Sequence, residues 1–113
     1  MSDMSDPESV VRRFFDVFNN ETPDQFEALI APDYLDYGQT PVGVGPKGAH
    51  TDYDYALKTF GHITYDINSL VPADDRVAVV WTGHMKDDKT FQGLSVYRVV
   101  NGQLAETRHA LVE

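Results

Sequence analysis

The stretch from Tyr97 to Leu111, YRVVNGQLAETRHAL, predicts a β-hairpin near the end of the chain. Asn101-Gly102 is the strongest two-residue hairpin signal in the sequence, because both residues tolerate the positive φ angles of a type I′ turn. The turn joins strands that we expect from Phe91 to Val100 and from Gln103 to Val112. The second of these strands carries a titratable imidazole, His109, in what we expect to be a sheet interior.

Two further strands are expected before this hairpin. Ile63, Tyr65 and Ile67 alternate with polar residues, which is the period of two that a half-buried strand requires. The second of these strands is expected over Arg76 to Trp81, where Val77 to Trp81 is a nearly continuous apolar run, and Asp74-Asp75 before it is typical of a turn. The second half of the chain therefore predicts an antiparallel meander of four strands.

Apolar residues at three- and four-residue spacing predict three helices in the first half of the chain. The first helix begins near Ser5–Glu8 and carries an apolar stripe that includes Phe18. The second begins at Thr22–Gln25, which has the spacing of a capping box. The third covers Ala49–Phe60, and we expect Asp52 on its solvent side.

One short strand, Tyr34–Tyr37, is expected between the second and third helices. The Gly- and Pro-rich segment Gly38–Gly48 follows it and is interpreted as a flap over a cavity mouth. Helices in the first half and an antiparallel sheet in the second half predict one α+β domain over residues 1–113. Long twisted hairpins curve around the helices, which leaves a cavity on the concave side of the sheet.

Composition excludes several classes of function. The chain has no cysteine, so disulfides, thiolate metal sites and a cysteine nucleophile are not available. The net charge of -9 repels phosphate backbones and anionic membranes, so we expect neither nucleic acid nor membrane partners. No apolar run approaches the ~18 residues of a membrane span and no signal peptide is recognisable, which favours a cytoplasmic location. The four histidines lack metal-ligand spacing and no nucleotide-binding loop is present, so we expect no metal and no cofactor.

Several stretches of the chain resemble the NTF2-like superfamily and, within it, the SnoaL-like polyketide cyclases. They are VVRRFFDVFN (Val10–Asn19), APDYLDYG (Ala31–Gly38), the segment Ile63–Thr82 that ends in VAVVWT, and the terminal YRVVNGQLAETRHAL. The resemblance covers essentially the whole chain. It implies an NTF2-like cone, in which three N-terminal helices pack on a curved, mainly antiparallel sheet. It also implies a homodimer formed by packing two sheets, for which we expect Leu94, Val96 and Leu104 at the interface.

His109 is the first candidate for catalysis, because an imidazole that titrates near neutral pH can take a proton from a carbon acid and return it to an enolate. In the cyclases that the chain resembles, the matching position holds an aspartate, and Tyr37 stands where family members often carry a histidine. Asp36 is the second candidate, as a base or as a group that orients the imidazole, and His84 at a strand end is the third. The alternatives are that His109 only hydrogen-bonds across the sheet, that Asp36 is a solvated acid and that His84 is exposed.

The candidate ligand contacts are aromatic. Trp81 offers a flat wall to a hydrophobic ligand, and Phe18 belongs to the apolar stripe of the first helix. Tyr37, Tyr53 and Tyr97 are candidate hydrogen-bond donors to a developing oxyanion. The alternative for each of these residues is simple core packing.

Three functions stay open from the sequence. The first is a cofactor-independent acid/base enzyme of the cyclase, isomerase or aldol type, acting on a small hydrophobic carbonyl compound. The second is a non-catalytic binding protein for an apolar ligand. The third is a dimeric interaction module.

Overall fold

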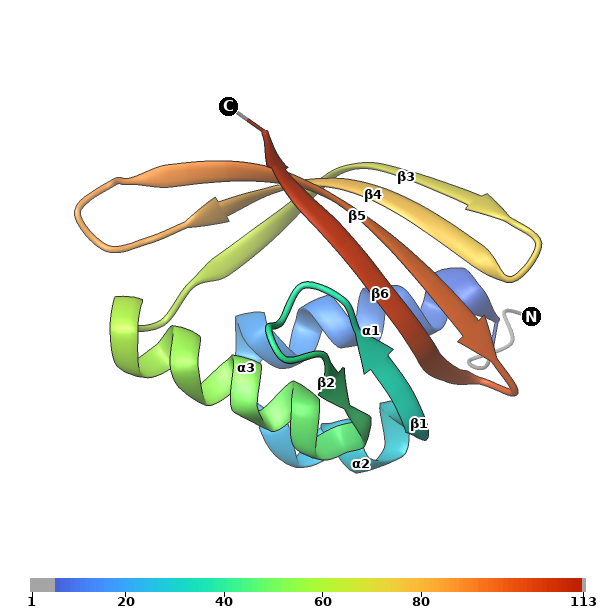
Figure 1. The fold of residues 1–113 in the computed structure, drawn as a ribbon. Helices are drawn as coiled ribbons and strands as arrows, with labels where there is room; N and C mark the ends of the chain where they lie inside the picture. The colour runs from blue at the N-terminus through green and yellow to red at the C-terminus, as the bar shows by residue number, and fades with distance from the viewer. Residues whose placement is uncertain (1–5, 113) are drawn as a thin grey trace.

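The computed structural model of the protein describes residues 6–112 and has the predicted order of helices and strands. Its elements are α1 (Pro7–Asn20), a 3-10 turn (Pro23–Gln25), α2 (Phe26–Leu29), β1 (Ile30–Asp36), β2 (Gly43–Val44), α3 (Gly45–Phe60), β3 (Thr64–Ala73), β4 (Arg76–His84), β5 (Thr90–Val100) and β6 (Gln103–Val112) (Figure 1). Asp6 caps α1 by accepting a hydrogen bond from the Ser9 N–H at 2.7 Å, and Ser5 lies outside the described residues. Within this part of the chain, no helix has the length and apolar character needed to cross a bilayer.

The strands form one six-stranded sheet in the order β2-β1-β6-β5-β4-β3. Strands β3 to β6 make the predicted antiparallel meander, and Asn101 and Gly102 turn the last hairpin with φ angles of 52° and 78°. β1 pairs in parallel with β6, and the short β2 extends the sheet beyond β1. The sheet is therefore mixed and mainly antiparallel, and the α+β fold is confirmed.

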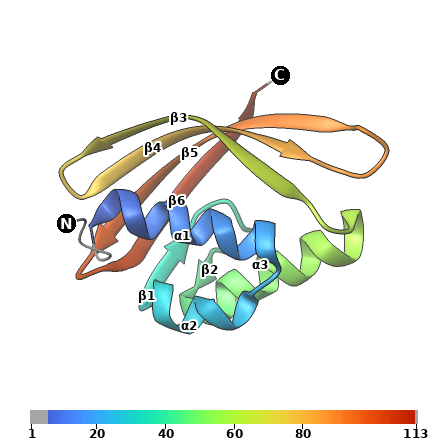
Figure 2. The same ribbon diagram turned by 180° about the vertical axis from the view of Figure 1, so that it is seen from behind.

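The helices lie on the concave side of the sheet (Figures 1 and 2). α1 contacts β3, β4 and β5, whereas α3 packs against β1 and β2 at the other end of the sheet. Apolar side chains of both layers fill the space between them and are almost fully buried: Val10, Val11 and Val17 of α1, Phe26 and Leu29 of α2, Val77 and Val79 of β4, and Leu104 of β6.

Asn19 holds the end of α1 against the edge strand β3. Its side-chain amide donates to the Tyr65 carbonyl at 3.0 Å, and its side-chain oxygen accepts from the Tyr65 N–H at 2.6 Å. One side chain thus satisfies both backbone groups of a residue on an edge strand, as a neighbouring strand would. This contact fixes the aromatic face of α1 over the sheet.

Leu104 is a correction to the sequence analysis, since it lies in the core with 0% exposure and not on the outer face of the sheet. The pairing of β5 with β6 shifts between Arg98 and Val99, so Val99 faces Leu104 while Arg98 faces Glu106. The extra residue, Ala105, reverses the alternation of side chains along β6. Leu104 and Thr107 consequently point to the same face, which strict alternation does not allow.

Two element boundaries also differ from the predictions. The strand expected over Tyr34–Tyr37 already begins at Ile30, so the second helix is reduced to a 3-10 turn and a single turn of α-helix. The third helix begins at Gly45, and β2 occupies Gly43–Val44 inside the segment interpreted as a flap. Only about half of that segment is therefore loop.

Candidate functional site

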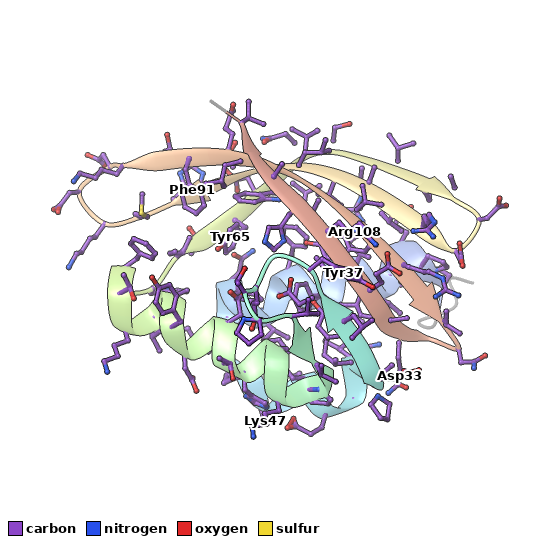
Figure 3. All side chains as sticks on the ribbon, viewed as in Figure 1. Asp33, Tyr37, Lys47, Tyr65, Phe91 and Arg108 are labelled. Carbon is purple, nitrogen blue, oxygen red and sulfur yellow. The ribbon has the colours of Figure 1, made fainter. Side chains whose placement is uncertain are left out.

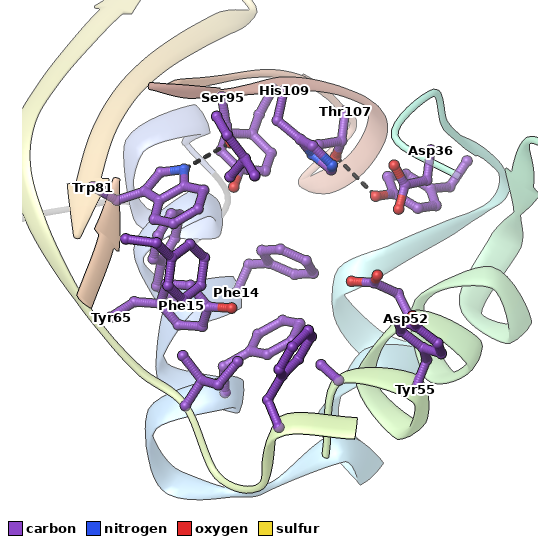
Figure 4. Close-up of a pocket in the computed structure, with 18 residues that line it drawn as sticks. Phe14, Phe15, Asp36, Asp52, Tyr55, Tyr65, Trp81, Ser95, Thr107 and His109 are labelled. Atoms are coloured by element: carbon purple, nitrogen blue, oxygen red, sulfur yellow. Dashed lines mark hydrogen bonds between the residues drawn. The ribbon is translucent and has the colours of Figure 1, made fainter. Parts of the chain in front are cut away.

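A cavity of about 240 Å³ lies between the helices and the concave face of the sheet (Figure 4). Its walls are mainly aromatic and come from α1, α3 and three strands, β3, β4 and β5: Phe14, Phe15, Phe18, Tyr55, Phe60, Tyr65, Trp81, Phe91 and Tyr97. Tyr55, Phe60 and Leu111 are 64%, 44% and 66% exposed, so they form the mouth. Ligand cavities of proteins run from about 300 Å³ upward, so this one suits a molecule of one or two rings.

Three titratable side chains line one end of the cavity: Asp36 of β1, Asp52 of α3 and His109 of β6. The parallel pairing of β1 with β6 sets Asp36 opposite Thr107, and His109 follows two residues later on the same face of β6. Tyr34 joins the two strands through its hydroxyl, which donates to Thr107 Oγ1 at 2.8 Å. Segments that are far apart in the sequence thus combine acids and an imidazole at one place.

Asp36 is 4% exposed, and both of its carboxylate oxygens accept hydrogen bonds. Oδ1 accepts from the Gly38 N–H at 2.8 Å, and Oδ2 accepts from Gln39 Nε2 at 2.9 Å. Gln39 Nε2 also donates to the Gly48 carbonyl of α3 at 2.9 Å. Asp36 therefore anchors the loop that follows β1 and ties it to the start of α3.

This loop passes directly over His109. A Cβ atom placed on Gly38 would overlap the imidazole at Nε2 and Cε1, so only glycine fits there without movement of the ring. On its other side, His109 belongs to the hydrogen-bonded sheet, where it pairs with Ser95 of β5. The imidazole thus contacts the Gly38 backbone and lines the cavity, while His109 as a whole is exposed to solvent and not enclosed in the interior of the sheet.

Asp52 is the functional candidate that the sequence analysis missed, because it was expected on the solvent side of the third helix. It lines the cavity instead, and burial and the negative charge of Asp36 raise the pKa of its carboxyl, which the proximity of His109 partly offsets. A signal was present in the sequence. Asp52 stands at helical spacing from Ala49, Ala56 and Phe60, so it belongs to the same helix face.

The phenol groups of Tyr34, Tyr65 and Tyr97 stay protonated at neutral pH. Burial, with a smaller contribution from the charge of Asp52, raises the pKa of Tyr65 to about 12. Burial likewise raises the pKa of Tyr34 and of Tyr97. The Tyr65 hydroxyl projects into the cavity and is therefore a hydrogen-bond donor facing a ligand (Figure 4).

Trp81 forms a rigid wall. Its indole N–H donates to Ser95 Oγ at 2.9 Å, and its ring packs edge-on against Tyr65 and Phe91. A Cβ atom on Gly93 would overlap the indole, so the backbone of β5 lies directly against the ring. The satisfied N–H leaves Trp81 to contact a ligand through its apolar surface.

Five of the residues predicted from the sequence line this cavity: His109, Asp36, Trp81, Tyr97 and Phe18. The structure does not bring His84, Tyr37 or Tyr53 to it. Trp81 and Gly83 of β4 face the cavity side, so His84 faces outward, where it pairs with Asp66 at 2.8 Å.

The two tyrosines have other contacts. Tyr37 is 40% exposed and lies under the guanidinium of Arg108, 4.0 Å from the ring centroid (Figure 3). Tyr53 is buried against Phe18 and Phe26 on the far side of the cavity wall. Within residues 6–112, no group of three or more histidines and acids is arranged to hold a metal ion. The described side chains therefore offer acid/base chemistry and hydrogen bonds.

The model of the SnoaL-like domain family matches residues 11–107. The chain belongs to the SnoaL-like family. An NTF2-like protein of unknown function from Mesorhizobium loti is 23% identical, with a TM-score of 0.79 over 100% of this chain and 97% of that chain. A SnoaL-like polyketide cyclase from Agrobacterium tumefaciens is 12% identical, with a TM-score of 0.80 over 96% of this chain and 92% of that chain. The comparison with curated proteins found no match. At these identities the solved structures establish the fold of this SnoaL-like protein.

Gly38→Ala is expected to displace the His109 imidazole, because the new methyl group and the ring cannot occupy the same space. Overpacking of this kind costs about 1–3 kcal/mol of stability unless the loop moves. NMR of the His109 ring signals measures the displacement. Val42→Ala, an exposed site in the same loop, is the matched control and should leave these signals in place. Unchanged ring signals in Gly38→Ala would contradict the contact.

Asp52→Asn is expected to raise the midpoint of thermal unfolding by a few degrees at pH 7. The carboxyl pKa is raised in the folded state, so the folded protein binds more protons and loses stability as pH rises above about 3.9, the ordinary value for aspartate. The uncharged amide of asparagine removes this loss of stability. At pH 3, where the carboxyl is protonated in the wild type, the variant and the wild type should unfold at the same temperature. Asp54→Asn, exposed on the same helix, is the control for net charge. If Asp52→Asn and Asp54→Asn raise the unfolding midpoint equally, the effect comes from net charge and contradicts a raised pKa at Asp52.

Proposed function

We propose that this SnoaL-like protein is a cofactor-independent acid/base enzyme that acts on a small hydrophobic carbonyl compound, in the manner of a cyclase, isomerase or aldol-type enzyme. The observation that carries the proposal is the position of His109, which faces an aromatic cavity with Asp36 and Asp52 at the same end. A carbonyl compound of one or two rings fits the volume. The family and the fold support binding of a small molecule.

His109 is the proposed base. Its neutral imidazole takes a proton from the carbon next to the substrate carbonyl, and the electron pair of the broken C–H bond moves onto the carbonyl oxygen to form an enolate. The Tyr65 hydroxyl donates a hydrogen bond to that oxygen. Its pKa of about 12 keeps the proton on the phenol, so it stabilises charge without being consumed.

The two aspartates have different parts in this scheme. Asp52 lies close enough to His109 for the two charges to interact, so its carboxylate favours the imidazolium that forms when the proton arrives. Asp36 is a positioning residue, because both of its oxygens hold the loop that packs on the imidazole. Return of the proton from the imidazolium to a different carbon, or to oxygen, completes an isomerisation. In an aldol-type ring closure the enolate carbon attacks a second carbonyl, which forms a C–C bond and an alkoxide, and the imidazolium gives its proton to that alkoxide.

A binding protein for an apolar ligand is the second candidate. The satisfied indole N–H of Trp81 and the largely aromatic lining favour it, since these groups contribute contact area and no chemistry. The two candidates differ in one property: only the enzyme accelerates proton exchange at carbon.

Exchange of the α-protons of 2-tetralone, a two-ring ketone, tests the enzyme. In D2O the wild-type protein should accelerate deuterium incorporation, followed by NMR, and His109→Gln should reduce the protein-dependent rate about 100-fold, as loss of a general base does. His50→Gln is the control, because His50 pairs with Glu27 outside the cavity. Exchange that survives His109→Gln would contradict the role of His109, and binding of the ketone without exchange would favour the second candidate.

We also propose that two copies pair through the convex face of the sheet. Val80 of β4 and Leu94 of β5 are cross-strand neighbours on that face, 39% and 42% exposed, and Val71 nearby is 58% exposed. Sedimentation at micromolar concentration should give a dimer, and Leu94→Asp should give a monomer. Val42→Asp, on an exposed loop, should remain dimeric. A monomeric wild-type protein would refute the pairing.

A further inference from the structure

The charged side chains that line the cavity are of one sign. Asp36 and Asp52 are among the lining residues, whereas no lysine or arginine is. His109 is the one basic group among them, and its proximity partly offsets the rise in the pKa of Asp52. An anionic ligand would therefore face two carboxylates with a single imidazole and no lysine or arginine to pair with.

Nearby arginine and lysine side chains do not compensate this charge. Arg108 neighbours His109 in sequence, but alternation along β6 turns it to the outer face, where it contacts Tyr37 and donates to Glu106 at 3.0 Å. On α3, Lys58 is exposed and does not line the cavity. The groups that donate to Asp36 are an amide side chain and a backbone N–H, and both are neutral.

Asp52 differs from Asp36 in having its carboxylate available. Among the described residues, no hydrogen bond or ion pair engages it, although the side chain lines the cavity. Its charge carries a cost, since burial and the charge of Asp36 both raise its pKa. A positive group on a ligand would remove that cost by pairing with it.

The aromatic walls of the cavity also favour a positively charged ligand. A cation over the face of an aromatic ring is attracted by the negative charge of the ring face, and the attraction grows when the site excludes water. Phe14 and Tyr55 line the same cavity as Asp52, with Tyr55 at its mouth (Figure 4). Carboxylates beside aromatic rings make a suitable environment for an alkylammonium group.

Building on the proposed function, we propose that the substrate carries a basic nitrogen: a one- or two-ring amine whose ammonium group pairs with Asp52 and whose rings contact the aromatic walls. The substrate class is thus an amino-substituted carbonyl compound. The ammonium group binds at the acidic end, where the two carboxylates of Asp36 and Asp52 face both the ammonium and the imidazolium that forms at His109. An electron-withdrawing ammonium also makes neighbouring C–H bonds more acidic, which assists abstraction by His109.

Three probes with one ring system and different charge test the proposal: 2-naphthylmethylamine as a cation, 2-naphthylmethanol as a neutral molecule and 2-naphthoate as an anion. Calorimetry at pH 7 should give the tightest binding for the amine, about tenfold tighter than the alcohol, with 2-naphthoate weakest. Asp52→Asn should lower the affinity for the amine about tenfold and leave the alcohol unchanged. Asp54→Asn removes the same charge from the exposed side of α3 and should keep the preference.

Wild-type protein that binds the alcohol as tightly as the amine overturns the proposal without any variant. A preference for the amine that survives Asp52→Asn overturns the role of Asp52. If Asp54→Asn reduces the preference as much as Asp52→Asn does, the preference comes from the net charge of the protein, which also overturns that role. The 2-tetralone assay separates this failure from failure of the proposed function. If 2-tetralone exchange depends on His109 but the protein binds the amine no better than the alcohol, the proposed enzyme stands and the proposed substrate class is wrong. If the protein prefers the amine but does not accelerate exchange, the ligand class stands and the proposed catalysis is wrong.

Discussion

The candidate site depends on the parallel pairing of β1 with β6. This pairing sets Asp36 beside Thr107, and it is extended by the Tyr37 N–H, which donates to the Thr107 carbonyl at 3.0 Å. The buried hydroxyl pair of Tyr34 and Thr107 adds a side-chain link across the same two strands. Because β1 leads directly into the loop over His109, the register of this one pair decides where the imidazole lies relative to both acids.

The sequence predicted the elements that local chemistry determines. The Asn101-Gly102 turn and the alternation along the last strands define the meander, since a hairpin depends on residues adjacent in the chain. The parallel contact of β1 with β6 was not predicted, because it joins residues about 70 positions apart and leaves no local pattern. The placement of Leu104 failed for a related reason, since one extra residue in β6 reverses the alternation without a distinctive sequence signal.

The site was predicted in part. His109, Asp36 and Trp81 were found because their residue types and strand positions suggest chemistry or a flat wall. Asp52 was missed because a charged residue on a helix is ordinarily solvated, whereas its spacing from Ala49 and Ala56 puts it on the inward face of the helix. His84 was included because it stands near a strand end, where the rims of pockets are found. Its outward direction follows only from the structure, in which Trp81 on the same strand faces the cavity. Buried charges at functional sites are where such rules fail most often.

The fixed position of Trp81 has a practical consequence for spectroscopy. It is the only tryptophan in the chain, it lines the cavity, and its N–H is bonded to Ser95 in an environment that is 7% exposed. Emission of this indole therefore comes from a single chromophore whose ring lines the cavity. The fold thus contains its own optical reporter of occupancy, and a library of unlabelled compounds can be screened by intrinsic fluorescence alone.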